Sequence, residues 1–379
     1  MKIAIVSDSI YPFSIGGSEI RNYEIAKRLV EKGHEIHIFG VKSWSGPDKI
    51  SKDKIILHGV STLRINKNAK RIPLDSLKFS LRLFKRLLKE KFDLIDVATF
   101  NYFNCYLTKG VNLINKTPLV FTWHQYFDDY LIGYFGKLKG TLAKILEKYS
   151  LKLSANNLCV SNSVKNELIK QNVSPSSTYV INNGVDFKTA KKSKPLKKKY
   201  DIIFVGRLTY QKNAMFLIKH LYLIKKMYPS LKIAIVGSGP DEKILHSAMR
   251  KYGVEKFVEF TGNITEKQKI FSYMKSSKLL VMPSLIEGFP LVAVEALACH
   301  LPIFASRKIK DVFEEFPESS VSFFDLNKDD FSQKIVSLLK KSEKNHSRNN
   351  SFVVKLDWDK IADKIERYYS SIIHKQPLL

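Results

Sequence analysis

Two glutamates eight positions apart offer the clearest chemistry in this sequence. Glu287 and Glu295 bound the stretch Glu-Gly-Phe-Pro-Leu-Val-Ala-Val-Glu, where a strand-like run ends and a helical pattern begins. Gly288 allows close backbone approach, and Pro290 suits the first helical position. The start of a helix attracts anions, so we expect a diphosphate there. The backbone N–H groups expected to face it are those of Phe289, Leu291 and Val292.

The positions of the two carboxylates predict different contacts. At ~1.5 Å per residue, Glu295 lies about 7 Å beyond the phosphate-facing end of the helix, which is the scale needed to reach a ribose. Glu287, before the turn, would face a transferred sugar. The alternative is that Glu287 caps the helix and Glu295 is solvated. Glu295 lies within an apolar run, however, and a carboxylate in such surroundings usually has a dedicated partner.

Two cations follow another strand-like run. Arg207 and Lys212 come after residues 202–205 and Gly206, five positions apart at the next helix start. Both can reach one cleft at the carboxyl edge of a sheet. The alternative is that they are ordinary surface cations of a very basic protein.

The elements that must position these residues alternate along the chain, as in a parallel sheet covered by helices on both faces. The pattern predicts α/β architecture with two doubly wound domains in tandem. Strands are expected at 3–6, 35–39, 94–97, 119–122, 157–160, 178–181, 202–205, 233–236, 258–260 and 278–282, and helices near 17–32, 77–88, 138–153, 162–170, 214–227, 241–252 and from 291 onward.

A Lys-rich segment sets the expected domain boundary. Seven of the twelve residues 188–199 are Lys, which suits an exposed linker. We therefore expect an N-terminal domain over 1–187 and a C-terminal domain over 200–355. A final segment, 356–379, carries an amphipathic helical pattern that needs a partner surface.

Composition narrows the class of protein. The 379 residues have a formal charge of +27, which attracts nucleic acid, anionic lipid or phosphorylated ligands without choosing among them. Cys105, Cys159 and Cys299 are widely spaced among apolar neighbours, so we expect reduced, buried thiols. No signal peptide or run of 18 apolar residues is found, and we expect a cytoplasmic protein.

The segment 283–298 resembles the E-x7-E motif of glycosyltransferase family 4, a group of retaining enzymes with the GT-B fold. The resemblance implies two Rossmann-like domains facing a cleft, with a C-terminal helix that crosses back to the first domain. It implies that Glu295 binds the donor ribose and that Glu287 contacts the donor sugar. It also implies that Arg207 and Lys212 stabilise the departing nucleoside diphosphate.

The resemblance extends to the first domain. Gly16 and Gly17 stand where the family has a glycine-rich loop that reaches the donor phosphates. His124 follows the run 119–122 in a Thr-x-His pattern that lines the reaction centre in the family. Ligands of open α/β sheets bind at such strand ends.

Other segments depart from the family pattern or are assigned to structure. The family often has a Gly pair after the strand that matches 302–305, whereas this chain reads Ser-Arg-Lys-Ile-Lys-Asp, so donor contacts there are in doubt. The glycines of 237–239 are interpreted as a turn, and 160–161 and 183–186 as packing between domains. Asp128 and Asp129 are expected to cap a helix, and no metal or cofactor is expected.

The expected function is a retaining, metal-independent transfer of a hexose from a nucleotide-diphosphate sugar, with UDP or GDP as the nucleotide, to a glycan or lipid-linked acceptor. The alternatives are a nucleotide-sugar epimerase or phosphorylase of the same fold, or a non-catalytic basic protein that binds membranes or nucleic acid. The fate of the nucleotide and the dependence of the reaction on inorganic phosphate would test the epimerase and phosphorylase alternatives. Donor binding would test the non-catalytic alternative.

Peripheral contact with an anionic membrane, at the inner face of the cell membrane, is a further expectation. Residues 76–89 mix Phe and Leu with Lys and Arg, as interfacial helices do. The same segment can equally be a helix that covers the sheet.

Overall fold

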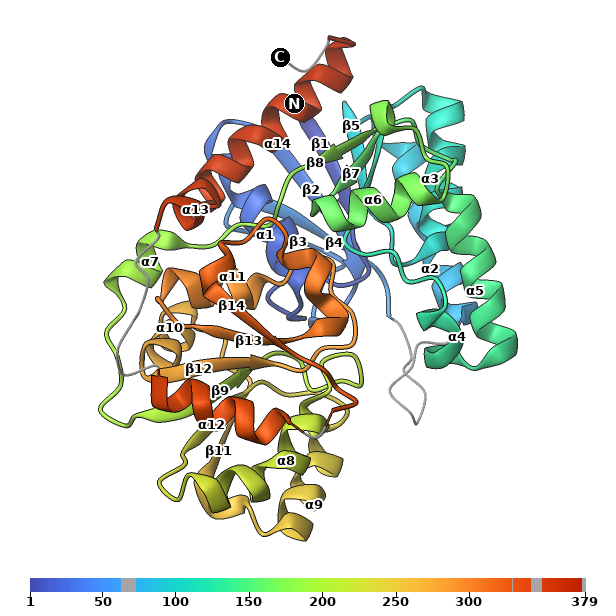
Figure 1. Ribbon diagram of the computed structural model, residues 1–379. Coiled ribbons are helices and arrows are strands. Elements are labelled where there is room, and N and C mark those ends of the chain that lie inside the picture. The colour runs from blue at the N-terminus through green and yellow to red at the C-terminus, as the bar shows by residue number, and fades with distance from the viewer. Residues whose placement is uncertain (63–72, 329, 342–349, 377–379) are drawn as a thin grey trace. The chain divides into compact units, whose positions relative to one another are not determined.

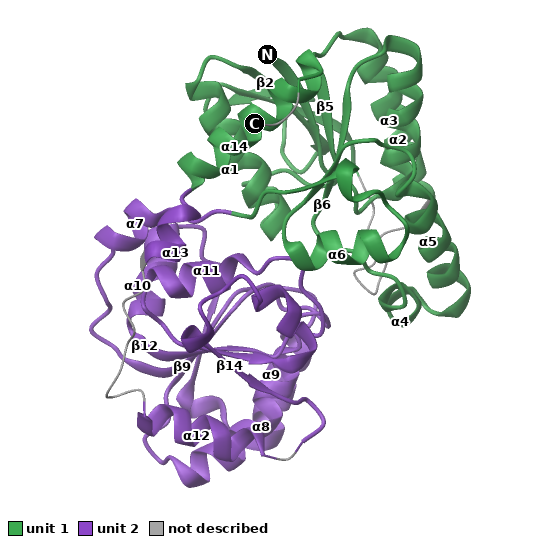
Figure 2. Cartoon of the chain, turned by 45° about the horizontal axis from the view of Figure 1, so that its top comes forward, with its two compact units in different colours: residues 1–183, 358–379 green, residues 184–357 purple. Residues whose placement is uncertain are grey.

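The structure is a computed structural model that describes residues 1–62, 73–328, 330–341 and 350–376. The chain divides into two compact units (Figure 2). Unit 1 comprises Met1–Asn183 and Trp358–Leu379, and unit 2 comprises Gly184–Asp357. Each unit has its own sheet, so the expected pair of parallel-sheet Rossmann-like domains is confirmed.

Unit 1 contains a sheet in the order β3-β4-β2-β1-β5-β6-β7-β8, parallel except for the antiparallel β3. The central strands are buried on both faces and are therefore almost continuously apolar. The strands are β1 (Lys2–Val6), β2 (Glu35–Val41), β3 (Lys49–Lys52), β4 (Ile55–Ser61), β5 (Leu94–Ala98), β6 (Leu119–Trp123), β7 (Asn157–Cys159) and β8 (Thr178–Val180).

The helices of unit 1 form packed groups (Figure 1). One group pairs α1 with α14, and another joins α2, α3 and α5. The helices are α1 (Gly17–Glu31), α2 (Pro73–Lys89), α3 (Tyr102–Asn115), α4 (Tyr130–Phe135), α5 (Lys137–Ser150), α6 (Asn162–Lys170) and α14 (Trp358–His374).

Unit 2 contains an all-parallel sheet in the order β11-β10-β9-β12-β13-β14. Its strands are β9 (Tyr200–Val205), β10 (Ile233–Val236), β11 (Val258–Gly262), β12 (Ser277–Met282), β13 (Ile303–Ser306) and β14 (Val321–Phe324). Its helices are α7 (Phe187–Lys192), α8 (Ala214–Met227), α9 (Glu242–Tyr252), α10 (Lys267–Lys275), α11 (Leu291–Ala298), α12 (Phe331–Lys341) and α13 (Asn350–Lys355). In Figure 1, α8, α9 and α12 cover one face of this sheet, and α10 and α11 the other.

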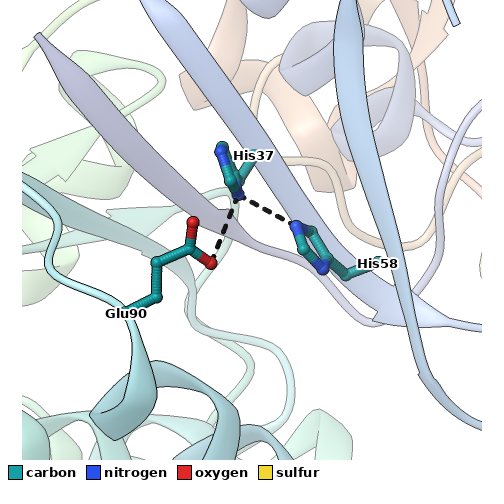
Figure 3. A group of neighbouring side chains, drawn as sticks. All are labelled: His37, His58 and Glu90. Atoms are coloured by element: carbon teal, nitrogen blue, oxygen red, sulfur yellow. Dashed lines mark hydrogen bonds and ion pairs between the residues drawn. The ribbon is translucent and has the colours of Figure 1, made fainter. Parts of the chain in front are cut away.

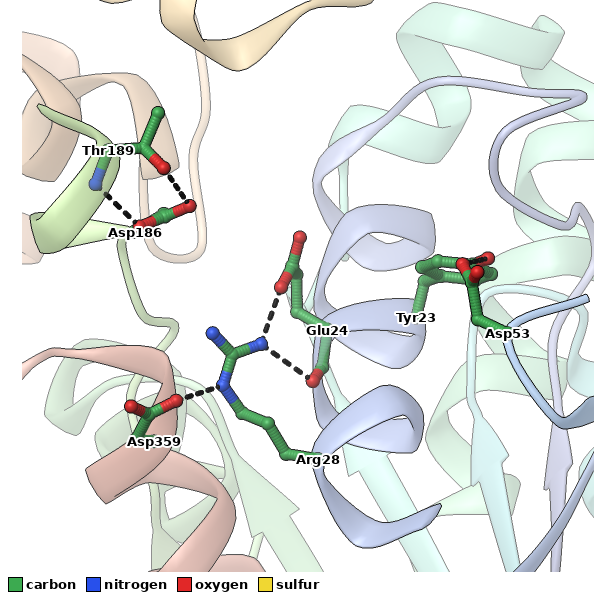
Figure 4. A network of polar contacts seen from close by, with 7 residues as sticks. All are labelled: Tyr23, Glu24, Arg28, Asp53, Asp186, Thr189 and Asp359. Atoms are coloured by element: carbon green, nitrogen blue, oxygen red, sulfur yellow. Dashed lines mark hydrogen bonds and ion pairs between the residues drawn. The ribbon is translucent and has the colours of Figure 1, made fainter. Parts of the chain in front are cut away.

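The C-terminal helix α14 belongs to unit 1, as the family resemblance implied. Its apolar side is buried, and Tyr369 donates a hydrogen bond to the buried carboxylate of Asp96 on β5. At its polar margin, Arg28 of α1 contacts both Glu24 and Asp359, at 2.5 and 2.7 Å (Figure 4). The apolar stripe therefore has the partner surface that it needs.

The unit boundary differs from the expected one. It falls between Asn183 and Gly184, and residues 188–199, although mostly exposed as expected, belong to unit 2 and include most of helix α7. Asp186 caps α7 by accepting from the backbone N–H of Thr189, and Ala190 is buried (Figure 4). The lysines of this segment point outward while its few small residues pack, so Lys content alone did not reveal the helix.

Other local expectations have mixed outcomes. The cysteines are free and buried, as predicted. Asp129 is the N-cap residue of α4, as predicted, but neither it nor Asp128 makes the expected capping hydrogen bond to this helix. Both carboxylates instead pair with Lys144, at 2.7 and 2.6 Å. Among the described residues, no helix combines the length and apolar character needed to cross a bilayer.

Candidate active site

The strand order of unit 2 places a candidate site at one point. β9 is the first strand of the unit, and the chain adds β10 and β11 on one side of it and then β12, β13 and β14 on the other. Open α/β sheets bind ligands beyond the carboxyl ends of the strands where the order reverses. That point lies between β9 and β12, and the segments that follow these strands are 206–213 and 283–290, which carry the predicted residues.

Backbone and amide contacts hold these two segments together. The backbone N–H of Leu285 donates to the carbonyl oxygen of Gln211 at 2.9 Å, and the Gln211 side chain donates to the carbonyl of Ile286 at 2.9 Å. The Asn213 side chain donates to the carbonyl of Pro283 at 3.2 Å. The relative position of the two segments is therefore fixed by hydrogen bonds.

The structure brings Lys212 and Glu287 into direct contact. The Lys212 Nζ lies 2.5 Å from Glu287 Oε1, and the Glu287 side chain is 7% exposed. Glu287 does not cap α11, whose N-cap residue is Pro290. A nearly buried carboxylate of this kind fixes the position of the ammonium group beside it.

Glu295 has the dedicated partner that its apolar surroundings indicated. It lies in the second turn of α11 and is 6% exposed. The partner is Lys267, the first residue of α10, which forms an ion pair with the Glu295 carboxylate. Sequence reasoning missed Lys267 because no motif separates it from the other lysines of a very basic chain.

The turn before α11 is close to the prediction, with one correction. Pro290 is the residue before the helix rather than its first residue, and Leu291 and Val292 open the first turn. Gly288 and Phe289 are buried between Glu287 and that turn. The backbone groups predicted to face a diphosphate thus lie at one helix end.

Arg207 is exposed on the segment after β9, and glycines of the next loop support its backbone. A Cβ on Gly237 would lie 2.0 Å from the carbonyl oxygen of Gly206, and one on Gly239 would lie 2.3 Å from that of Leu208. These glycines were interpreted only as a turn. They also allow the close backbone approach that shapes the Arg207 segment.

The predicted residues of unit 1 lie at the carboxyl ends of its strands. Gly16 is the N-cap of α1, Gly17 its first residue, and the Glu19 carboxylate lies against Gly16. His124 directly follows β6, and its Nε2 is buried with no hydrogen-bond partner among the described residues. Burial, and to a lesser extent the charge of Arg21, lowers the pKa of His124 to about 3, so its imidazole is neutral.

A buried arginine near His124 was not predicted. Arg21 is 1% exposed and donates from Nη1 to the carbonyl of Asn182 and to Oδ1 of Asn183, at 2.8 and 3.0 Å. Burial lowers the pKa of Arg21 to about 10. Burial also raises the pKa of Asp96, which accepts from Thr122 at 2.6 Å. The first pair of contacts joins α1 to the end of the first segment of unit 1, and the last joins β5 to β6.

Comparison with known proteins identifies the family. The family described as Glycosyltransferase Family 4 matches residues 15–189, and the one described as Glycosyl transferases group 1 matches residues 186–352. The chain belongs to glycosyltransferase family 4. As a member of this family it is a glycosyltransferase of the hexosyltransferase type, which sets aside a non-catalytic role.

Relatives of this family 4 glycosyltransferase include enzymes named for lipid acceptors. It is 24% identical to the gpi3 subunit of phosphatidylinositol N-acetylglucosaminyltransferase of Schizosaccharomyces pombe, over 99% of this chain and 81% of that protein. It is also 24% identical to alpha-monoglucosyldiacylglycerol synthase of Acholeplasma laidlawii, over 87% of this chain and 86% of that protein.

Solved structures agree with this family 4 glycosyltransferase in fold, which is GT-B. Sucrose-phosphate synthase of Thermosynechococcus elongatus matches with a TM-score of 0.79 at 18% identity, over 99% of this chain and 100% of that one. Anabaena HepE in complex with UDP-glucose matches with a TM-score of 0.72 at 18% identity, over 98% of this chain and 100% of that one.

Proposed function

We propose that this glycosyltransferase transfers a hexose from a nucleotide-diphosphate sugar, with retention of configuration and without a metal ion. The observation that carries the proposal is the paired arrangement in unit 2, where two nearly buried glutamates each hold a lysine close to the point at which the strand order reverses. Carboxylates, cations and a helix start are the groups that ribose hydroxyls and a diphosphate need.

Each residue has a role in this proposal. The diphosphate lies at the first turn of α11, and Arg207 and Lys212 neutralise the charge that develops on it. Glu295 accepts hydrogen bonds from the ribose hydroxyls, and Lys267 shares that carboxylate. Glu287 contacts the donor sugar and holds Lys212 in position.

The proposed transfer step is a displacement on one face of the donor sugar. The acceptor oxygen forms a bond to the anomeric carbon on the face from which the diphosphate leaves. The bond from that carbon to the phosphate oxygen breaks, and the acceptor proton passes to the leaving phosphate. The two cations stabilise the charge in place of a metal ion.

Residues of unit 1 have proposed roles of their own. The N–H groups at Gly16 and Gly17 open α1 and face the donor phosphates, which requires the Glu19 carboxylate to turn away from them. His124, neutral because its ring is buried, exchanges hydrogen bonds with a sugar hydroxyl rather than delivering a proton as imidazolium.

The comparisons support a proposal for the donor and acceptor classes. HepE binds UDP-glucose, so UDP is the proposed nucleotide and GDP the competing one. The names of the relatives specify phosphatidylinositol and a glucosyl diacylglycerol, so a lipid acceptor is proposed ahead of a free glycan.

A surface on α5 supports contact with an anionic membrane. Leu138, Leu142, Ile145 and Tyr149 recur at helical spacing and are exposed, with Leu138 at 86%. Exposed lysines lie beside them at 137, 139, 148 and 152. Apolar side chains flanked by lysines are what a helix at an anionic lipid interface presents. The segment predicted from the sequence, 76–89, lies in α2, which buries Phe79, Leu83 and Leu87 against the unit and exposes Leu81.

Vesicle sedimentation tests the membrane surface. Replacing Leu138 and Leu142 together by Ser should release the protein from vesicles that contain anionic lipid. Ile244→Ser is the matched control, because Ile244 is also exposed but lies alone on α9 of unit 2. Undiminished binding of the double variant would contradict the assignment of this surface.

A transfer assay tests the proposed reaction. The full chain is incubated in EDTA with UDP-hexoses or GDP-mannose and vesicles of phosphatidylinositol or diacylglycerol, and the lipid product is analysed by mass spectrometry and NMR. The expected product is an α-glycoside formed from an α-linked donor. An inverted product, or activity only after a divalent metal is restored, would refute the proposed chemistry.

A further inference from the structure

A cluster of two histidines and a glutamate lies in unit 1 away from the predicted transfer residues. His37 of β2, His58 of β4 and Glu90, which follows α2, each direct one ligand atom toward a common point (Figure 3). His37 Nδ1 lies 2.9 Å from His58 Nε2 and 3.8 Å from Glu90 Oε2. The three ligand atoms lie within 4.8 Å of one another.

The orientation of His37 is fixed as in many metal sites. Its other ring nitrogen, Nε2, lies 2.8 Å from Glu35 Oε1, so it donates its N–H to that carboxylate. Nδ1 of His37 is then the unprotonated ring nitrogen, and its lone pair is directed at His58 and Glu90. Metal-binding histidines usually donate their second N–H to a carboxylate or carbonyl in this way.

Aromatic packing restrains both imidazole rings. The ring of Phe39 stacks on His58 with a centroid distance of 4.2 Å, and Phe92 contacts the edge of His37 at 5.1 Å. His37 is fully buried and His58 is 6% exposed. Rings held this firmly lose little freedom when they bind an ion.

The charges of the cluster suit a divalent cation. Lys2 Nζ lies 2.8 Å from Glu90 Oε1 and 3.1 Å from Glu35 Oε1, so two carboxylates share one ammonium group and leave a net charge of −1.

We propose that His37 Nδ1, His58 Nε2 and Glu90 Oε2 bind one zinc ion, with water as the fourth ligand. Tetrahedral zinc with bonds of ~2.0–2.1 Å places its ligand atoms about 3.3 Å apart. The two histidine nitrogens must separate by about 0.4 Å, and Glu90 Oε2 must approach His37 by about 0.5 Å and His58 by up to about 1.5 Å. Without metal, Nε2 of His58 carries a proton and donates it to His37. When zinc binds, that proton moves to Nδ1 of His58.

The site is structural. Glu35 begins β2, and Glu90 precedes β5, so the cluster lies toward the amino ends of the strands, opposite the carboxyl ends that carry His124. The ion would join β2, β4 and the end of α2. The proposal is independent of the proposed transfer reaction, which uses no metal.

Metal titration of the full chain tests the site. Protein treated with EDTA and exchanged into clean buffer is titrated with zinc against a chromophoric chelator, and with cobalt, whose visible absorption reports four-coordinate binding. The expected result is one equivalent bound and a rise in Tm. His58→Gln and Glu90→Gln should each abolish the cobalt spectrum, and Glu35→Gln should weaken zinc binding by about 10–100-fold.

The controls separate this site from adventitious binding. His246→Gln removes a partly buried histidine of unit 2 outside the cluster and should leave the titration unchanged. Circular dichroism establishes that each variant is folded. If His58→Gln fails to fold, Glu90→Gln still tests the site, because it changes only a residue at a helix end. Absence of a saturable equivalent, or equal binding by wild type and Glu90→Gln, would overturn the proposal.

Discussion

Replacing His124 by Gln should reduce the acid sensitivity of unit 1. The folded pKa of His124 is about 3, against an ordinary value of 6.5 in the unfolded chain. The unfolded state therefore binds a proton below pH 6.5 that the folded state cannot bind until about pH 3. Stability is lost as pH falls through this window, and between pH 7 and 5 the loss from this one group is about 2 kcal/mol.

The assay is urea unfolding followed by tryptophan fluorescence at pH 7, 6 and 5. The three tryptophans, Trp44, Trp123 and Trp358, all belong to unit 1, so the signal reports that unit. The free energy of unfolding of wild type should fall by about 2 kcal/mol more than that of His124→Gln over this range. His374→Gln, at an exposed histidine of the same unit, should behave as wild type. Equal losses in wild type and His124→Gln would refute the burial argument.

Three further predictions concern the site and the packing of each unit. Lys212→Met should lower kcat by about 10²–10³ in a transfer assay, with a smaller effect on donor binding, because the cation acts on charge that develops during transfer; an unchanged kcat would contradict this. Gly237→Ala should destabilise unit 2 and impair transfer, because its Cβ would lie 2.0 Å from a carbonyl oxygen. In the control Gly253→Ala the new Cβ meets no atom within 4 Å, so transfer should stay intact. Circular dichroism and the transfer assay distinguish the two variants. Tyr369→Phe should cost about 1–3 kcal/mol in tryptophan-monitored urea unfolding, because a buried carboxylate loses its donor; a loss below about 0.5 kcal/mol would refute that role.

Where local sequence signals agree, the elements were predictable. The helix expected at 162–170 is α6 with the same bounds, because Ser161 caps it by accepting from the backbone N–H of Val164. The strand expected at 119–122 is β6, extended by Trp123. Apolar runs and caps act within a few residues, so they can be read from the chain.

Elements with weak local signals were missed. Helix α3 carries Gly110, which is unfavourable inside a helix, and Asn at several positions. It is stabilised instead by packing against α2 and α5, where Gly110 lies close to the ring of Phe84. Strand β3 was missed because it is short and largely polar, and β4 because it joins the sheet by parallel pairing with β2, which no local pattern shows.

The candidate site was predictable in its residue types but not in its pairings. Glu287 and Lys212 were each singled out, yet their contact joins segments 75 positions apart. Lys267 was missed because only the fold brings it to Glu295. Arg21 was missed because a helical arginine is normally exposed, and its burial depends on acceptors from residues 182 and 183.

Donor binding tests the central claim most directly. Isothermal titration in EDTA should show that wild type binds one equivalent of a UDP- or GDP-hexose and that Glu295→Gln binds it at least tenfold more weakly. Glu255→Gln, at an exposed glutamate of unit 2, should bind as wild type does. Equal binding by wild type and Glu295→Gln, or no binding without a metal ion, would contradict the account.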